Sequence, residues 1–337
     1  MFDEVRECAV HAVFPRCMGA PASYAITRAR AARHPARLSM VFPNSRGPTA
    51  VWQTGTTLVQ VARMDRTSMP PRPAWYGWIY LLLVSAGAFG GSLLVLLITG
   101  RQTDPALVWL LKCGLVMVLV VAITAFYLRR DGLAWSDYGV SLRARIGIAA
   151  TRGLLTGLLL ALLWAGIVAV WSPVEWRFNP AFGADAWLLG TAAALMIGIA
   201  EEVGYRSYAL DRLYVRYGAA TSVLAPSAVF VLVHVIGGVP WLAGLLVVGS
   251  CSVLYGTLML VTRNLPFVAA FHIANNLIQD ALLRTGPGSV WQPVFADVEA
   301  AHRHQAGIWA CMALVNLAAA VYAWKRWGTV RRATATD

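Results

Sequence analysis

Long apolar segments recur along this chain of 337 residues and leave few folds open to it. From Ala74 onward, eight segments have the length and apolarity of a membrane span, which takes about 20 residues as a helix. They run over residues 75–99, 105–128, 148–171, 186–210, 219–236, 241–262, 264–283 and 306–324. In lipid a spanning segment must satisfy its own backbone hydrogen bonds, which favours helices. The sequence therefore predicts an all-α fold, a polytopic membrane helix bundle of about eight transmembrane helices.

Composition supports this class and argues against others. Hydrophobic residues make up 58% of the chain and charged residues 13%, whereas soluble domains carry about a quarter charged residues. The net charge of +12 does not indicate a nucleic-acid partner, because the sequence has no compact basic patch with interleaved aromatic residues. The five cysteines form no CxxC pair and no zinc-finger spacing, so a disulfide framework is not expected. The expected surroundings are the lipid bilayer.

Positive charge indicates the orientation of the bundle. When alternate loops are assigned to opposite sides, fourteen Arg and Lys residues fall on one side and four on the other. The positive-inside rule makes the richer side cytoplasmic, which places both termini in the cytoplasm. Because the chain is also rich in Ala and Arg, we expect an integral protein of the bacterial inner (cell) membrane.

Three regions follow from these patterns. Residues 1–70 are rich in Arg, Ala and Pro, lack helical or strand periodicity, and have no apolar run long enough for a signal peptide. We interpret them as a disordered basic N-terminal tail, with Met64 and Met69 as alternative start sites. Residues 74–325 form the transmembrane domain, and residues 326–337 form a basic cytoplasmic tail.

Polar residues interrupt the fourth, fifth and seventh apolar segments. A charged side chain at the bilayer centre costs about 2.5–3.5 kcal/mol on insertion scales, so such residues usually face the protein interior and mark functional sites. The interrupting residues are Glu201, Glu202 and Arg206, then His234, then His272 and Asn276. Three such interruptions at compatible depth suggest one site.

Helical spacing assigns directions to these side chains. Glu202 and Arg206 are four residues apart, so they share a helix face and can pair. Glu201 is rotated by about 100° from its neighbour and can point into a different cavity. At a rise of 1.5 Å per residue, the polar groups lie roughly 12–20 Å from the cytoplasmic ends of their helices. They can therefore converge in one chamber near mid-membrane.

Such a chamber has the groups needed for hydrolysis. A carboxylate and a neutral imidazole can together remove a proton from water, which makes the water a nucleophile. A second histidine and an asparagine supply donors where an oxyanion develops. Alternatively, Glu201, His234 and His272 could bind Zn²⁺, since two His and one Glu form a known catalytic ligand set. The HExxH motif is absent, and the sequence leaves metal-bound and directly activated water as alternatives.

Each interruption also has a structural interpretation. For Glu202 and Arg206 we favour a buried structural ion pair over direct catalysis. Glu201 could form a second ion pair with Arg212, but we favour a catalytic role for it. The polar pair of the seventh segment could be an interhelical hydrogen-bond clamp. Close helix approach is expected at two GxxxG pairs, which are Gly87/Gly91 and Gly153/Gly157.

Taken together, the interruptions resemble the motifs of the CAAX protease and bacteriocin-processing family of intramembrane endopeptidases. The matching residues are Glu201-Glu202-x-x-x-Arg206, Phe230-x-x-x-His234 and His272-x-x-x-Asn276, in the family's order and in separate apolar segments. The resemblance covers roughly residues 135–325 and strictly 187–283. One mild departure is Tyr205, where many relatives have Phe.

The resemblance implies hydrolysis of a peptide bond in a membrane-associated or C-terminal peptide substrate. It assigns a catalytic role to Glu201, His234, His272 and Asn276, and a supporting role to Glu202 and Arg206. Glu201 and His234 would activate water, and His272 with Asn276 would stabilise the oxyanion. A metal-free glutamate mechanism, which requires no cofactor, is the better physical fit, with Zn²⁺ as the alternative.

Two other functions compete with a peptidase. A non-catalytic immunity or scaffold protein of the same fold would bind a peptide without cutting it, and only an activity measurement separates it from an enzyme. A transporter that uses the carboxylates as a proton relay is disfavoured, because the sequence lacks paired Gly/Pro-broken helices.

Overall fold

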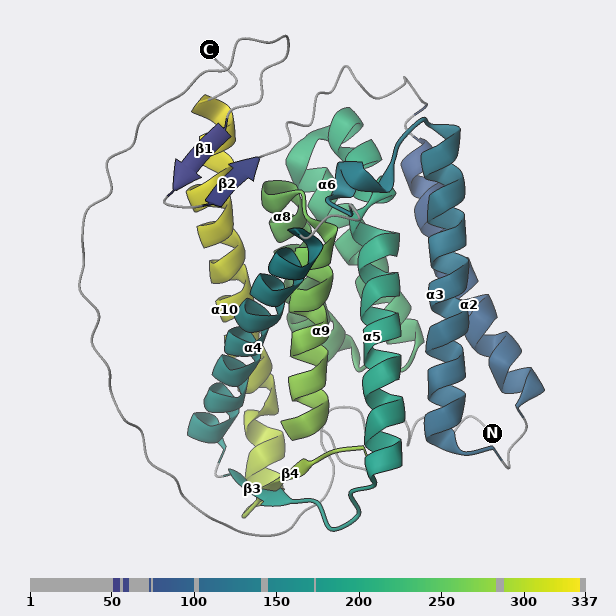
Figure 1. Cartoon of the computed structure of the whole chain (residues 1–337). Coiled ribbons are helices and arrows are strands. Elements are labelled where there is room, and N and C mark those ends of the chain that lie inside the picture. The colour runs from purple at the N-terminus through teal and green to yellow at the C-terminus, as the bar shows by residue number, and fades with distance from the viewer. Residues whose placement is uncertain are drawn as a thin grey trace.

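The computed structural model describes residues 51–54, 57–60, 73, 75–99, 103–140, 145–172, 174–282 and 288–333. Long helices make up most of this part of the chain (Figure 1). They are α2 (Trp75–Ile98), α3 (Pro105–Arg130), α4 (Arg145–Trp171), α5 (Ala184–Arg206), α6 (Tyr208–Ile236), α8 (Ser250–Thr262), α9 (Leu265–Leu282) and α10 (Val298–Ala333). A short 3-10 helix η1 (Trp135–Tyr138) follows α3, and α8 is preceded by α7 (Trp241–Ala243) and a π-helical stretch, η2 (Gly244–Gly249).

The predicted fold class, an all-α polytopic bundle, is confirmed. Within the described residues, six helical stretches are long and apolar enough to cross a membrane. One of them, Ala184–Ile236, contains both α5 and α6, and α9 is not among the six. The number of eight crossings therefore stays a prediction, although a helix lies at each of the eight expected positions.

The ends of the chain differ in part from their predicted structure. Strands β1 (Val51–Thr54) and β2 (Thr57–Gln60) pair in antiparallel fashion inside the segment that was expected to lack strands. The rest of residues 1–70 lies outside the described residues, including the predicted start sites. At the other end, α10 stays helical to Ala333, so most of the predicted basic tail continues this helix.

Helix α9 lies between α4 and α5 (Figure 1), and glycines set how closely the three pack. A Cβ atom at Gly153 would lie 2.1 Å from the carbonyl oxygen of Phe267, and one at Gly157 would lie 2.3 Å from that of Phe271. The backbones of α4 and α9 are therefore in direct contact, as the GxxxG spacing predicts. On the other side of α9, Ile273 packs against Gly198 of α5.

Buried ion pairs join the elements at the end of the bundle where α5 passes into α6. Arg212 of α6 pairs with Asp131 at the end of α3, and this carboxylate also accepts a hydrogen bond from Tyr208 at 2.7 Å. The preceding residue, Asp211, binds Arg263, with 2.8 Å between Oδ2 and Nη2. Arg263 lies in the turn between α8 and α9 and has a φ of 53°, which is uncommon for a residue with a side chain.

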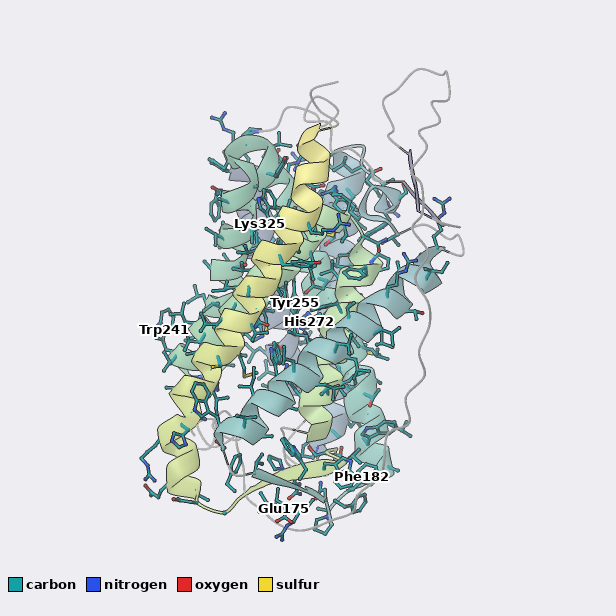
Figure 2. All side chains as sticks on the ribbon, turned by 90° about the vertical axis from the view of Figure 1, so that its left-hand side faces the viewer. Glu175, Phe182, Trp241, Tyr255, His272 and Lys325 are labelled. Atoms are coloured by element: carbon teal, nitrogen blue, oxygen red, sulfur yellow. The ribbon has the colours of Figure 1, made fainter. Side chains whose placement is uncertain are left out.

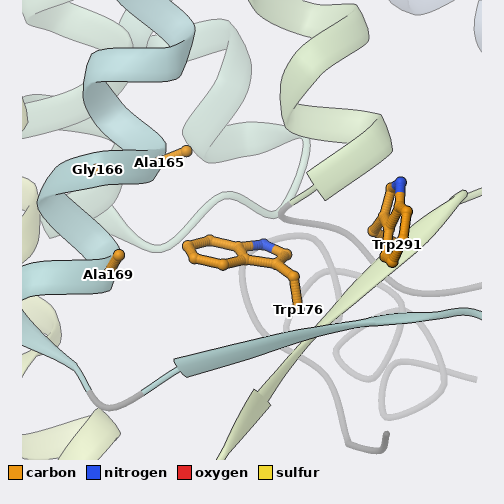
Figure 3. Close-up of a pocket in the computed structure, with 5 residues that line it drawn as sticks. All are labelled: Ala165, Gly166, Ala169, Trp176 and Trp291. Atoms are coloured by element: carbon orange, nitrogen blue, oxygen red, sulfur yellow. The ribbon is translucent and has the colours of Figure 1, made fainter. Parts of the chain in front are cut away.

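The opposite end of the bundle carries a two-stranded sheet of β3 (Val174–Phe178) and β4 (Trp291–Phe295), which are antiparallel with Trp176 opposite Pro293. A hollow of about 390 Å³ lies between this sheet and α4 (Figure 3). Its lining is apolar and consists of Ala165, Gly166, Ala169, Trp176 and Trp291. None of the polar residues singled out in the sequence lines it.

Candidate active site

The two adjacent glutamates occur near the C-terminal end of α5 and have different surroundings. Glu202 is fully buried, whereas the side chain of Glu201 is 17% exposed. This difference follows from the helical rotation between neighbouring residues. Gly204 lies two residues beyond Glu202. Because it has no side chain, Val84 of α2 packs directly against the backbone of α5 at this point. The predicted divergence of the two carboxylates is thus present.

Glu201 faces two imidazole rings from two other helices. Its Oε1 atom is 3.8 Å from Nε2 of His234 on α6, and its Oε2 atom is 3.5 Å from Nε2 of His272 on α9. These separations exceed those of good direct hydrogen bonds and are short enough for one water to contact both groups. The structure therefore brings together three of the four residues expected to react.

The fourth residue, Asn276, lies one turn beyond His272 on α9 and is half-buried. The spacing of four places both side chains on one face of the helix, as expected. The contacts that join Glu201 to the two histidines do not include Asn276.

Glu202 binds two groups at once. Its Oε1 atom is 3.3 Å from Nη1 of Arg206, the pair that the spacing predicts, and both side chains are buried. The same oxygen lies 2.8 Å from Nδ1 of His272. The other oxygen, Oε2, is buried with no hydrogen-bond partner among the described residues. The contact with His272 was not predicted, and it gives Glu202 a direct link to the site.

Arg206 is enclosed by aromatic and polar groups. Its Nη2 atom donates to Oγ of Ser252 on α8 at 2.8 Å. Its guanidinium lies 4.5 Å from the centre of the Phe230 ring, a geometry in which a cation is attracted to the ring face. Arg206 therefore connects α5 to both α6 and α8.

His234 is oriented by the residue one turn before it. The backbone carbonyl of Phe230 accepts a hydrogen bond from Nδ1 of His234 at 2.9 Å. The two rings are also in contact, with 4.3 Å between their centroids. Because a carbonyl oxygen can only accept, this bond places the proton on Nδ1 and leaves Nε2 as an acceptor in the neutral ring. The Phe230-x-x-x-His234 motif thus works as one unit.

Helix α8 contributes residues that the sequence analysis missed. Tyr255 stacks on His272 with 4.6 Å between ring centroids, and Asn275 donates to the Tyr255 hydroxyl at 2.9 Å. Ser252 and Tyr255 are three residues apart, on one face of a helix without a family motif. The one feature of the sequence that could have identified them is the presence of two polar residues three positions apart inside an apolar segment.

Two further predictions can be compared with the structure. Arg212 pairs with Asp131, so its observed partner is not Glu201. Tyr205, which departs from the Phe of many relatives, has its hydroxyl 3.1 Å from Oγ of Ser85 on α2. The extra hydroxyl thus has a buried polar partner, which explains how this position tolerates Tyr.

The described residues do not form a ready metal site. Among them, no group of three or more His, Cys, Asp or Glu side chains is arranged to hold a metal ion. Three of the four imidazole nitrogens of the site are close to a carboxylate, and the fourth is bound to a carbonyl. Zinc binding by Glu201, His234 and His272 stays the alternative prediction, and chelator treatment tests it.

An apolar helix bundle with carboxylate and imidazole groups inside it defines an integral membrane protein with a buried hydrolase-like site. Residues 183–278 match the family model described as type II CAAX prenyl endopeptidase Rce1-like. This segment spans α5, α6, α8 and most of α9, which carry all the motif residues. The match supports the resemblance of these helices to the CAAX protease and bacteriocin-processing family, and because the matched model describes a protease family, it supports peptidase activity at a general level. No curated protein and no solved structure matches the chain.

Proposed function

We propose that this protein is an intramembrane endopeptidase that hydrolyses a peptide bond of a membrane-associated or C-terminal peptide substrate. The observation that carries the proposal is the position of the Glu201 carboxylate between the Nε2 atoms of His234 and His272. The partial exposure of Glu201 and His234 supports access of water and substrate to this point.

Glu201 and His234 activate the water in this proposal. A water that contacts Oε1 of Glu201 and Nε2 of His234 has an acceptor on each side, because Nδ1 of His234 already donates to a carbonyl. Glu201 takes a proton from the water as it attacks the substrate carbonyl carbon. The protonated carboxyl group then delivers this proton to the leaving amine, as a carboxyl base in a partly desolvated site can.

His272 and Asn276 stabilise the oxyanion that forms on the carbonyl carbon. His272 has Nδ1 at Glu202, so its Nε2 becomes a donor when the ring is an imidazolium, in which both nitrogens carry protons. The Glu202 carboxylate offsets the positive charge of that ring. The Asn276 amide supplies a second donor from the same helix face. Glu202 therefore supports the reaction through His272, in addition to pairing with Arg206.

The proposed setting is the bacterial inner membrane, with both termini in the cytoplasm. Arg129 and Arg130 support this orientation, since they are exposed at the end of α3 on the arginine-rich side. The proposed partners are the lipid bilayer and a peptide or protein substrate, and no nucleic acid.

The decisive experiment is Glu201→Gln in a cleavage assay with membrane-anchored and C-terminal peptides. Gln is nearly isosteric but cannot take a proton from water, so we expect cleavage to fall by about two to four orders of magnitude while the protein stays folded and binds substrate. The matched control is Glu299→Gln, at an 89% exposed glutamate side chain outside the site, which should cleave like the wild type.

Two outcomes would change the proposal. Near-wild-type cleavage by Glu201→Gln would remove the catalytic role, and a wild type that binds peptides without cutting them would favour the immunity or scaffold function. Chelator treatment separates the two chemistries of water activation. The proposed mechanism requires no cofactor and should be insensitive to chelator, whereas a zinc enzyme would lose activity and regain it with added Zn²⁺.

A further inference from the structure

Helix α8 forms the wall behind His272, and we propose that its Tyr255 is a positioning residue for this histidine. The inference rests on the proposed function, in which both nitrogens of His272 have separate partners. Figure 2 labels Tyr255 and His272 close together near the centre of the bundle. The rings of the two residues are 4.6 Å apart between centroids and inclined by 31°, so the phenol lies over the imidazole face.

The orientation of the imidazole ring decides whether the site is assembled. Nδ1 of His272 is 2.8 Å from Glu202, and Nε2 on the other side of the ring is 3.5 Å from Glu201. Rotation of the ring about its bond to Cβ would move both nitrogens away from these carboxylates together. A flat aromatic surface against the imidazole face opposes this rotation. Tyr255 thereby acts on the reaction through His272 rather than on the substrate.

Tyr255 is itself fixed by the helix that carries His272. It is 2% exposed, and its hydroxyl accepts a hydrogen bond from Nδ2 of Asn275 at 2.9 Å. Phe271 meets the same ring edge-on, with 5.8 Å between centroids. Three residues of α9 thus contact one ring of α8, which fixes the rotation of α9 relative to α8.

Polar contacts also hold α8 against α5 and α10. Ser252, which precedes Tyr255 by three residues on α8, accepts a hydrogen bond from Arg206 of α5. On the α10 side, Nδ2 of Asn316 donates to Oγ of Ser250 at 2.9 Å and lies 3.4 Å from Sγ of Cys251. The ring of Tyr255 therefore stands on a helix anchored on two sides.

Two substitutions at Tyr255 separate the ring from its hydroxyl. Tyr255→Met keeps much of the volume and removes the flat ring, so His272 can rotate. We expect kcat to fall by roughly 10²-fold with little change in KM, because small misplacements of reacting groups have costs of this size. Tyr255→Phe keeps the flat ring and should retain most of the wild-type kcat and the wild-type pH profile.

The second measurement reports on His272 directly and does not depend on cleavage. In ¹⁵N-histidine NMR spectra of the purified protein, His272→Gln identifies the His272 signals. We expect wild type and Tyr255→Phe to show a single set of His272 ring-nitrogen signals, as one fixed ring orientation requires, and Tyr255→Met to show more than one set. If Tyr255→Met does not fold, Tyr255→Leu decides in its place, since it also removes the flat ring and should change both readouts in the same direction.

Three results would overturn the inference. One is wild-type kcat, pH profile and NMR signals in a folded Tyr255→Met. Another is an equal loss of activity in the Phe and Met variants, and the third is a lowered Tm with unchanged His272 signals, which would indicate a packing role alone. Failure of the proposed function would give a different result, because then either the wild type would not cleave peptides or Glu201→Gln would still cleave them. In both cases the NMR comparison still tests the role of Tyr255.

Discussion

At the scale of single residues, the adjacent carboxylates of Glu201 and Glu202 have different environments although one peptide bond separates them. Glu202 is fully buried, with a cation and an imidazole on one oxygen. Glu201 is partly exposed and has imidazole nitrogens near both oxygens, none within direct hydrogen-bonding distance. A rotation of about 100° along the helix is enough to give one a supporting position and the other a reactive one.

Removing one partner of the Glu202–Arg206 pair should lower stability as well as activity. Glu202→Gln and Arg206→Leu each leave a buried charge without its partner, which typically costs about 3–5 kcal/mol. We expect a lower folded yield and a lower Tm in detergent for both variants.

An exposed pair in the same chain gives the matched control. Glu299 and Arg303 are also four residues apart, with 4.0 Å between their charged atoms and most of each side chain exposed. Glu299→Gln and Arg303→Leu should leave Tm unchanged, because exposed pairs contribute little. Equal stability of all four variants and the wild type would show that the Glu202–Arg206 pair is not structural.

At the scale of helices, direct backbone contact places the residues of α9. Because the α4 glycines meet the carbonyl oxygens of Phe267 and Phe271, no side-chain layer separates the two helices. His272 follows Phe271 immediately, so its height in the bundle depends on this contact. The close approach of α4 and α9 is therefore part of the construction of the site.

Gly157→Ala tests this dependence. The new Cβ atom would lie 2.3 Å from the Phe271 carbonyl oxygen, so α9 has to move. Overpacking of this kind typically costs about 1–3 kcal/mol, and we expect a lower Tm together with a large loss of cleavage. Gly166→Ala in the same helix is the control, because no atom lies within 4 Å of its Cβ position. A Gly157→Ala variant as active as Gly166→Ala would contradict the prediction.

The sequence predicted where helices lie and which residues share a helix face, but it predicted less well which helices are adjacent. Charged groups such as Glu201 could be found because a charge in an apolar span is costly. Ser252 and Tyr255 gave little signal, since a hydroxyl is far more easily tolerated in such a span than a charge. The contact between Glu202 and His272 joins residues seventy positions apart, and it depends on which helices are adjacent. Spacing within one helix cannot supply that information.

At the scale of the whole molecule, two neighbouring residues join the bundle at its arginine-rich end. Asp211 reaches the turn between α8 and α9, while Arg212 reaches the end of α3. The start of α6 is thereby connected to elements on both sides of it. A single short segment therefore couples the end of α3 to the turn that precedes α9, the helix of His272 and Asn276.

The N-terminal 63 residues should be dispensable for this assembly. The contacts of the candidate site come from Val84 and residues after it, and the first long helix of the bundle begins at Trp75. A segment without a periodic apolar pattern contributes little to a bundle core. We expect a chain that starts at Met64 to insert, fold and cleave like the full chain, as measured by detergent stability and peptide hydrolysis.

The control is a shorter chain that also lacks α2. Tyr80 and Ser85 of this helix bind Thr124 and Tyr205 inside the bundle, so their loss should abolish folding. Failure of the chain that starts at Met64 to fold or to cleave would show that the N-terminal segment does contribute.

The bend in α6 at Gly218 bears on the position of His234. Glu201 and His272 come from helices that glycines hold in close contact, whereas His234 comes from the part of α6 beyond Gly218. Gly218 has a φ of 83° and a ψ of −176°, a backbone conformation that is essentially restricted to glycine. The backbone conformation of one glycine therefore sets the direction of the helix segment that carries His234, and with it the position of Nε2 beside Glu201.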